Sequence, residues 1–502
     1  MREHLPIIIF LIPFFSAICM PMVGAKSVRW CRPIALLAVF AMCVPAVVNL
    51  VLVLTEGETR YAFGGWPISG STSSAPLGIE WVNDRLASIM IVALSAIASL
   101  CLIYSGPVSP RSLGRQVVLY YTLILMLITS LTGIIFAGDL FNIFVFLELA
   151  ALSGYALVGV AGDRALIASF RYLILGTLGA TFYLLGVVFF YATTGTLNMA
   201  DLAQQLADKP DLLTNKAVIG GTTFMFIGLG IKMALFPLHG WLPGAYTRAP
   251  DAISPMLAAL MTKVSLYAWV RIMFWVLGAK AEFGQVHLLT LLGIFGAIAA
   301  VVGALLALSQ HDVKRMFAYG GISHVGLILI GVSQGNETAF AGSMFYLIND
   351  AAMQAGLFFI AGVAIYHHPT RTIENLSSLR NGSPWIIATL IILAMSMIGI
   401  PPTGGFFGKW HIILGAIEAQ NYWAVAAIII ATILTMAYFQ RLFVRIFSEP
   451  EMPADAEKVE THFALRFSIA ATSIVVIAMG ICSDPIIRVF RDVAQSAGLG
   501  AN

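Results

Sequence analysis

The chain has 502 residues, of which 59% are hydrophobic and only 11% are charged. A soluble domain carries roughly 25% charged residues, so this composition excludes a soluble enzyme or binding module and indicates an integral membrane protein. The formal net charge of +3 is too small to indicate a nucleic-acid partner, and the five cysteines, which show no paired spacing, predict neither a disulfide framework nor a metal site.

Apolar runs of helical length predict the architecture. Runs of about 17–25 residues can span a bilayer, and the chain contains about fourteen, with no soluble domain between them. The N-terminal run lacks a small-x-small cleavage site, so we expect a retained first helix. We therefore predict an all-α polytopic membrane protein, with residues 1–502 forming one membrane domain. The spans are expected near residues 5–23, 34–54, 86–104, 115–136, 139–160, 166–192, 217–241, 253–277, 287–308, 317–334, 339–365, 385–406, 422–446 and 464–490.

Lysine and arginine counts in the loops predict the orientation. With an even number of spans, both termini lie on one side of the membrane. The loops on the opposite side hold fifteen lysines and arginines, whereas the terminal side holds eight. Because cytoplasmic loops carry the positive excess, we expect both termini outside the cytoplasm of a bacterial or archaeal cell, with the protein in its inner (plasma) membrane.

Two predicted spans contain proline breaks. The seventh runs through Pro237, and the twelfth runs through the pair Pro401–Pro402. Proline removes a backbone donor and clashes with the preceding turn, and such breaks are tolerated at membrane depth only where protein or a water-filled cavity satisfies the freed groups. Since the breaks lie five spans apart, they predict two inverted five-helix repeats, at about 112–277 and about 287–446, with a site near the midplane.

Four ionisable side chains interrupt the apolar spans, namely Glu148, Lys232, Lys263 and Lys409. A charge at mid-bilayer costs at least ~2.5–3.5 kcal/mol, so an intramembrane ionisable residue is a functional-site hypothesis by default. Lys232 and Lys409 are 177 positions apart, and Glu148 and His324 are 176 apart, which fits the two repeats. Together these residues predict a path for protons or cations.

In the first half, the pattern favours an ion pair beside the break. Lys232 precedes Pro237, where freed carbonyls can hydrogen-bond its ammonium, and a buried lysine can bind and release protons. We expect it to pair with Glu148, because a nearby opposite charge couples the titrations of two groups; a purely structural pair is the alternative. Asp139 lies nine residues before Glu148, half a turn out of phase on a helix, so it is a secondary candidate.

The remaining polar residues extend this path across both halves. We expect Lys263 to continue the relay and Lys409 to end it, with His324 between them because imidazole both donates and accepts near neutral pH. His239 is a secondary candidate, since capping the broken helix would explain it equally well. Asp350 is a further buried carboxylate candidate.

Two other basic residues are predicted to be solvated. Arg271, near the end of its span, is expected to snorkel to the interface, and Lys314 is placed with Asp312 in a polar cytoplasmic loop. The sequence contains no Walker loop, GxGxxG after a strand, CxxC pair or haem motif. We therefore expect ion movement without a bound redox cofactor or a metal.

Four long motifs stand in the predicted spans and their loops: GDLFNIFVFLE, ALFPLHGWLPGAYTRAPDAIS, QHDVKRMFAYGGISHVG and GIPPTGGFFGKW. They resemble the antiporter-like subunits shared by Mrp-type cation/proton antiporters, respiratory complex I and membrane-bound hydrogenases. The resemblance covers nearly all of helices four to thirteen. It implies a proton path through Glu148, Lys232, Lys263, His324 and Lys409.

The chain departs from that family at two positions. Many relatives carry a lysine in helix eleven where this chain has Gln354, and many carry a histidine where it has Tyr246. The central relay is therefore expected to run through Asp350 and water, or to be weaker than in those relatives. The length near 500 residues resembles the D-type member of the Mrp antiporters or the shorter complex I subunits. Lys409 in place of glutamate and the GDLF motif favour the D-type Mrp member.

We therefore predict a proton-translocating subunit of a multisubunit Mrp-type antiporter that exchanges protons for Na⁺ or K⁺ beside other integral membrane subunits. The alternative is a proton-pumping subunit of an NADH–quinone oxidoreductase or membrane-bound hydrogenase, in which case the chain would count as part of a translocase. A passive membrane scaffold or a quinone-binding subunit is an alternative of a different class, and the buried charges argue against it because a scaffold has no reason to bear their cost.

The orientation is testable by labelling. Cysteines introduced in the 371–380 loop should react only with a reagent that reaches the cytoplasm, because this loop lies on the side with the positive excess. Cysteines introduced in the 55–85 loop should react with an impermeant reagent from outside. The reverse labelling pattern would contradict the predicted orientation.

Overall fold

The computed structural model describes residues 2–65, 78–108, 114, 116–278, 282–283, 286–367, 372–373, 383–448 and 462–500. Within these residues, twelve helices are long and apolar enough to cross a membrane. The predicted all-α polytopic fold is therefore confirmed. Most of the 371–380 loop lies outside the described residues.

The elements follow one another along the chain as helices, with two small hairpins among the described residues. The first half holds η1 (Arg2–His4), α1 (Leu5–Lys26), η2 (Val28–Trp30), α2 (Cys31–Glu56), β1 (Thr59–Ala62), η3 (Phe63–Gly65), β2 (Glu80–Asn83), α3 (Arg85–Val108), α4 (Val117–Phe136), α5 (Leu140–Gly159), α6 (Asp163–Thr194), α7 (Met199–Asp208), α8 (Asp211–Thr214), α9 (Lys216–Lys232), α10 (Leu242–Arg248), α11 (Ile253–Met256), η5 (Leu257–Met261), α12 (Thr262–Arg271) and η6 (Ile272–Leu277). The second half holds β3 (Glu282–Phe283), β4 (Val286–His287), α13 (Leu288–Leu308), α14 (Val313–Val332), α15 (Glu337–His367), α17 (Pro384–Ile398), α18 (Gly404–Glu418), α19 (Tyr422–Ser448), α20 (Phe463–Ile481) and α21 (Ser483–Ser496). Strands β1 and β2 pair antiparallel, as do β3 and β4.

The two predicted breaks account for the other two predicted spans. Helix α9 ends at Lys232 and is separated from α10 by the turns at residues 233–241, while α17 and α18 are separated by residues 399–403. One boundary differs from the prediction. The last span was expected to reach residue 490, but α20 ends at Ile481 and a separate helix, α21, follows. The span ends earlier because α21 is amphipathic, and an amphipathic helix lies along the end of the bundle rather than continuing through it.

Side chains satisfy the backbone groups that the breaks set free. The Trp241 indole donates a hydrogen bond to the Ile231 carbonyl oxygen at 2.7 Å. At the second break, the Gly405 amide donates to the Ser396 hydroxyl at 3.0 Å. Because protein atoms supply these partners, irregular backbone can persist at membrane depth.

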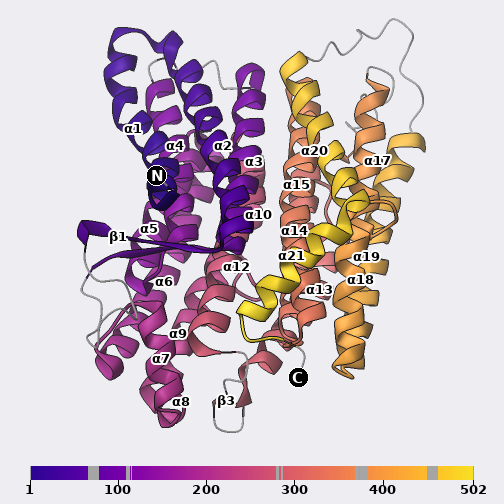
Figure 1. Ribbon diagram of the computed structural model, residues 1–502. Helices are drawn as coiled ribbons and strands as arrows, with labels where there is room; N and C mark the ends of the chain where they lie inside the picture. The colour runs from indigo at the N-terminus through magenta and orange to yellow at the C-terminus, as the bar shows by residue number, and fades with distance from the viewer. Residues whose placement is uncertain are drawn as a thin grey trace, which may run out of the picture.

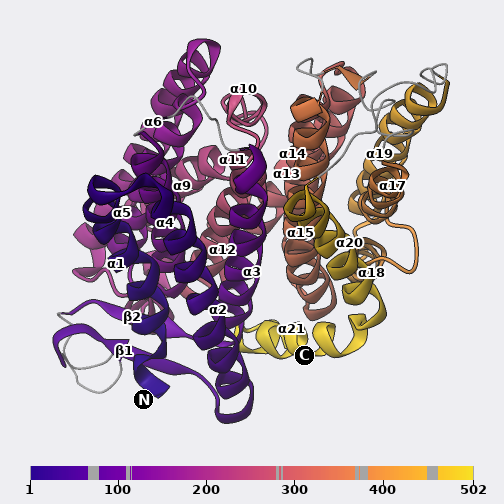
Figure 2. The same ribbon diagram turned by 90° about the horizontal axis from the view of Figure 1, so that it is seen from above.

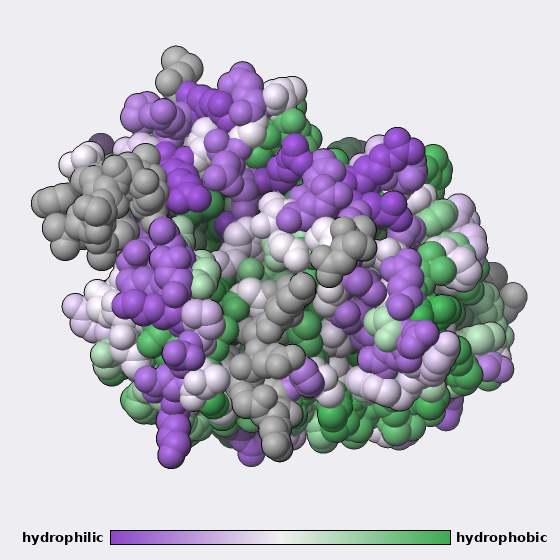
Figure 3. All heavy atoms as spheres, turned by 60° about the horizontal axis from the view of Figure 1, so that its bottom comes forward, coloured by the Kyte–Doolittle hydropathy of each residue, from purple (hydrophilic) through white to green (hydrophobic). Residues whose placement is uncertain are grey.

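The two halves of the chain stand side by side. In Figures 1 and 2, α1 to α12 form one group of helices and α13 to α20 form the other, while α21 runs across the end of the bundle between them. Helix α21 contacts both α3 and α15, so it connects the two groups. Hydrophilic residues gather on the face at the bottom of Figure 1, and hydrophobic side chains lie at the margins of that face (Figure 3).

Burial identifies the central helices. The continuous helix Ile253–Leu277 is buried along its whole apolar stretch, and α14 and α15 are almost as deeply buried. By contrast, about two thirds or more of the residues in the apolar stretches of α1 and α2 face the surroundings of the chain. Charged side chains on the three central helices are therefore surrounded by protein rather than by lipid.

Both ends of the chain lie at one end of the bundle. Arg2 pairs with Glu56 at the end of α2 at 3.1 Å, and Arg85 at the start of α3 pairs with Asp492 of α21 at 2.6 Å. The connections between α1 and α2 and between α13 and α14 lie at the other end, because helices alternate in direction.

Close packing of α20 against the second break leads to a stability prediction. A Cβ atom on Gly480 would press on the Pro402 carbonyl oxygen and lie 2.7 Å from the Thr403 carbonyl carbon. We expect Gly480→Ala to cost about 1–3 kcal/mol, as overpacking of a filled core does, and to lower the thermal unfolding midpoint of the purified protein. Gly220→Ala is the control, because nothing lies within 4 Å of its Cβ position. Equal midpoints for both variants would contradict this packing.

Candidate functional site

The first half places a lysine and a glutamate together at the break. Lys232 is the last residue of α9 and is buried, and its Nζ lies 3.2 Å from Oε1 of Glu148 on α5. The Glu148 side chain keeps 25% of its surface exposed. The structure therefore brings the predicted partners into one ion pair, with the carboxylate on its more accessible side.

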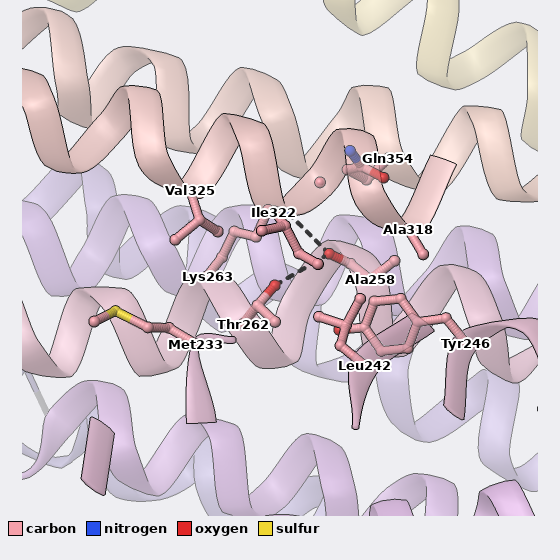
Figure 4. Close-up of a pocket in the computed structure, with 11 residues that line it drawn as sticks. Met233, Leu242, Tyr246, Ala258, Thr262, Lys263, Ala318, Ile322, Val325 and Gln354 are labelled. Carbon is pink, nitrogen blue, oxygen red and sulfur yellow. Dashed lines mark hydrogen bonds between the residues drawn. The ribbon is translucent and has the colours of Figure 1, made fainter. Parts of the chain in front are cut away.

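Lys263 is presented by a widened turn of the central helix. The π-helical segment η5 precedes it, and π turns leave a carbonyl group without its regular helical partner. Lys263 Nζ donates to the Ala258 carbonyl oxygen at 2.9 Å, and the Thr262 hydroxyl approaches the same oxygen at 3.4 Å. These contacts hold the ammonium beside its own helix (Figure 4).

Asp350 joins the two halves of the molecule. Its Oδ2 atom lies 2.7 Å from Lys263 Nζ, and its Oδ1 atom lies 2.7 Å from His324 Nδ1. All three side chains are buried, and they come from three different helices: α12, α14 and α15. The Tyr346 hydroxyl lies 3.2 Å from the same histidine nitrogen. Asp350, a secondary candidate in the sequence, is thus the centre of the buried cluster.

Lys409 lies in α18, the helix that follows the second break, and its surroundings differ from those of Lys232. Its Nζ donates to the Met397 carbonyl oxygen at 2.7 Å and to the Ile398 carbonyl oxygen at 3.2 Å. It lies 5.9 Å from the centre of the Tyr346 ring. In the described part of the chain it has no ion-pair partner, so backbone dipoles of the broken helix hold its charge.

The five path residues implied by the resemblance therefore fall into three groups. Tyr346 contacts the Asp350 cluster and faces Lys409, which links the central group to the second break. No direct hydrogen bond between Lys232 and Lys263 occurs among the described residues. Met233, the neighbour of Lys232, lines the same small cavity as Lys263, so these two groups are close without touching.

The other two secondary candidates lie outside this chain of contacts. Asp139 caps α5 by accepting a hydrogen bond from the Asn142 amide at 2.6 Å, and burial raises the pKa of its carboxyl to about 6. His239 lies in the first break, where its ring stacks on Phe236 with centroids 5.1 Å apart. Both positions fit a role in holding a helix end.

Two basic residues expected in solvated positions are buried instead. Arg271 does not snorkel: it pairs with Asp84 and lies over the Trp275 ring at 4.6 Å. Lys314 is not solvated in a loop: it lies in the first turn of α14 and pairs with Asp251 at 2.6 Å. The sequence did not reveal these pairs because each partner is distant in the chain. The only signal of these pairs in the sequence was a carboxylate, Asp84 or Asp251, beside the end of a predicted span.

Gln354 and Tyr246 meet at a cavity beside Lys263. The cavity has a volume of about 10 Å³, and its lining includes Lys263, Thr262, Tyr246 and Gln354 (Figure 4). The Tyr246 hydroxyl donates to the Leu257 carbonyl oxygen at 2.9 Å. The two positions at which the chain departs from the family pattern thus border the same space.

The fold and the site define a membrane subunit with two broken helices, each carrying a buried lysine, on either side of a buried carboxylate. Residues 137–435 match the family described as NADH:quinone oxidoreductase/Mrp antiporter, TM. This match covers more than half of the chain, and the chain belongs to that family.

Relatives in the family carry more than one name. The chain is 39% identical over 487 residues to the N subunit of NADH-quinone oxidoreductase from Desulforudis audaxviator, covering 96% of this chain and 95% of that protein. It is 29% identical over 495 residues to the D subunit of the Na⁺/H⁺ antiporter from Alkalihalophilus pseudofirmus, covering 98% and 97%. A chain in the solved structure of the membrane-bound sulfane sulfur reductase, an archaeal respiratory membrane complex, superposes with a TM-score of 0.88 at 28% identity, covering 98% and 97%.

The position of Asp350 generates a prediction. Asp350→Asn removes the charge shared by Lys263 and His324, and a buried ion left without its partner costs about 3–5 kcal/mol. We expect proton transport by the assembled complex to fall about tenfold or more, which corresponds to at least ~1.4 kcal/mol on the rate-limiting step. Asp484→Asn is the control, because this carboxylate forms an exposed pair with Arg488. Wild-type transport by assembled Asp350→Asn would contradict the central position of this group.

Proposed function

We propose that this chain is the proton-translocating subunit of a multisubunit membrane complex. The observation that carries the proposal is the position of Asp350, whose two oxygens contact Lys263 and His324 inside the bundle. Burying three ionisable groups is costly, and a path for protons between the two broken helices is the function that this cost best explains.

The contacts suggest how a proton could move. Lys263 and His324 share the negative charge of Asp350, so a proton arriving at one of them weakens the hold of Asp350 on the proton of the other. At the ends of the path, Glu148 holds the charge of Lys232, and carbonyl groups hold that of Lys409. Lys232 can therefore bind a proton and release it when Glu148 changes charge, whereas Lys409 can do so when the geometry of the helix end changes.

The finer proposal is that this complex is an Mrp-type antiporter that exchanges protons for Na⁺ or K⁺. It is supported by the similarity to the D subunit of a Na⁺/H⁺ antiporter over 98% of the chain. Similarity to a named subunit also supports assembly with other integral membrane subunits. The two five-helix repeats, about 112–277 and about 287–446, and the location of both termini outside the cytoplasm belong to the same proposal.

A second candidate is a proton-pumping subunit of a redox-linked complex such as an NADH–quinone oxidoreductase. It is favoured by the higher identity, 39%, to the N subunit of an NADH-quinone oxidoreductase and by the structural similarity to a respiratory membrane complex. The two candidates share the proton path and differ in what drives it.

Transport by the purified native complex in lipid vesicles separates these candidates. An antiporter should move protons in response to a Na⁺ or K⁺ gradient alone. A redox-linked pump should ignore that gradient and move protons only when the electron donor and acceptor of its complex are present. Proton movement under neither condition would overturn the proposed function.

Lys232 provides the mutational test. Lys232→Ala removes a proton carrier at the helix break, so coupled transport should fall to background while the complex still assembles. Lys216→Ala is the matched control, because Lys216 is an exposed lysine at the start of the same helix. Near-normal transport in assembled Lys232→Ala would exclude this lysine from the path.

A further inference from the structure

Another buried ion pair lies apart from the path described above, at the end of the bundle opposite the termini. Lys314 Nζ lies 2.6 Å from Asp251 Oδ1, and the lysine is fully buried. Its ammonium also donates to the Ser254 hydroxyl at 3.0 Å and to the Ala249 carbonyl oxygen at 3.3 Å. The Asp251 side chain keeps 23% of its surface exposed. The pair therefore has an accessible acidic end and a buried basic end.

Helix α14 leads from this pair to the central cluster. At 1.5 Å of rise per residue, Ala318 lies about 6 Å along the helix from Lys314, and His324 lies about 15 Å along it. Ala318, Gly321 and Ile322 of this helix line the cavity beside Lys263. The cavity thus lies between the levels of the two charged groups on α14.

Ser254 and Tyr246 make a second connection to the same cavity. The Ser254 hydroxyl, which accepts a hydrogen bond from Lys314, lies 2.8 Å from the Tyr246 carbonyl oxygen. The Tyr246 side chain lines the cavity (Figure 4). Ser254 and Tyr246 therefore connect the Asp251–Lys314 pair to the wall of the cavity.

Gln354 indicates what the cavity binds. Its side chain is buried, lines the cavity, and has neither its amide nitrogen nor its amide oxygen hydrogen-bonded to another described residue. Buried polar groups normally have partners, and a cavity of about 10 Å³ holds about one water molecule. A water there can accept a hydrogen bond from the Gln354 amide and carry a proton toward Lys263.

We propose that Asp251 and Lys314 exchange protons between the cytoplasmic face and Lys263, with a water bound at Gln354 carrying the proton over the last step. The inference rests on the proposed function and the proposed orientation. Protonation of Asp251 removes the charge that holds the Lys314 ammonium. Lys314 then passes its own proton inward and regains one from the Asp251 carboxyl, so that each group returns to its starting charge.

A pH test of this proposal depends on the charged and titratable groups near Asp251. Asp251 pairs with Lys314 of α14 and lies near Tyr104 of α3, and Arg248 ends α10 three residues earlier in the chain. Tyr104 donates a hydrogen bond to the Phe359 carbonyl oxygen at 2.8 Å. A pH effect specific to the cytoplasmic side can therefore be traced to the Asp251–Lys314 pair.

The experiment uses the native complex in vesicles, with the pH of each side varied separately and protons driven from the cytoplasmic side. Asp251→Asn keeps the shape of the side chain but cannot collect protons. We expect the cytoplasmic pH of half-maximal transport to become more acidic by about one pH unit, a tenfold change in proton concentration. The dependence on the pH of the other side should stay as in the wild type.

Two further variants keep the result interpretable. Asp251→Asn combined with Lys314→Met removes both charges, so no unpaired buried ion remains. This double variant should show a shift at least as large in the dependence on cytoplasmic pH, even if the single variant fails to assemble. Asp492→Asn, in the pair with Arg85 at the other end, should leave both pH profiles unchanged.

The outcomes discriminate between the proposals. Slower transport with unchanged profiles on both sides would show a structural role and overturn the inference, as would wild-type transport in both Asp251 variants. Either result leaves the proposed function standing if the wild-type complex moves protons. A wild-type complex that moves no protons overturns the proposed function and this inference with it.

Discussion

The structure depends on one buried carboxylate placed between two groups that can carry positive charge. Asp350 contacts Lys263 and His324 at the same distance, 2.7 Å, and the three side chains belong to the three most deeply buried parts of the bundle. A buried charge is stable only when its partners are fixed in place. The cluster therefore helps to fix the relative positions of α12, α14 and α15. A change in its protonation would alter the electrostatic contacts between the two halves of the molecule.

The two broken helices stabilise the charges of their buried lysines in different ways. Lys232 has a carboxylate partner in Glu148, whereas Lys409 is held by the carbonyl groups of the break itself. A lysine paired with a carboxylate responds to movement of that carboxylate. A lysine held by carbonyl groups responds to the geometry of the helix end. The two ends of the proposed path can therefore be controlled separately, as the proposed transport between two sides of a membrane requires.

Patterns local in the sequence predicted the spans and the breaks, because hydrophobic runs and prolines determine them directly. The pairing of Lys232 with Glu148, which lie 84 residues apart, was predicted from their opposite charges within apolar spans. The contacts of Asp350 were harder to predict from the sequence, because they depend on how three separate helices pack against one another. The same limit explains two wrong predictions. Arg271 and Lys314 were placed in solvent, yet their partners, Asp84 and Asp251, come from distant segments.

The central claim is that the two halves form one connected path, and a double-variant comparison tests it most directly. Glu148→Asp and Lys409→Arg keep the charges but alter their positions, so each should slow proton transport by the native complex without abolishing it. In one connected path the double variant should be about as slow as the slower single variant, because both steps limit the same flux. Losses of flux that add, as two parallel paths would give, would show that the two halves act independently and would contradict the account.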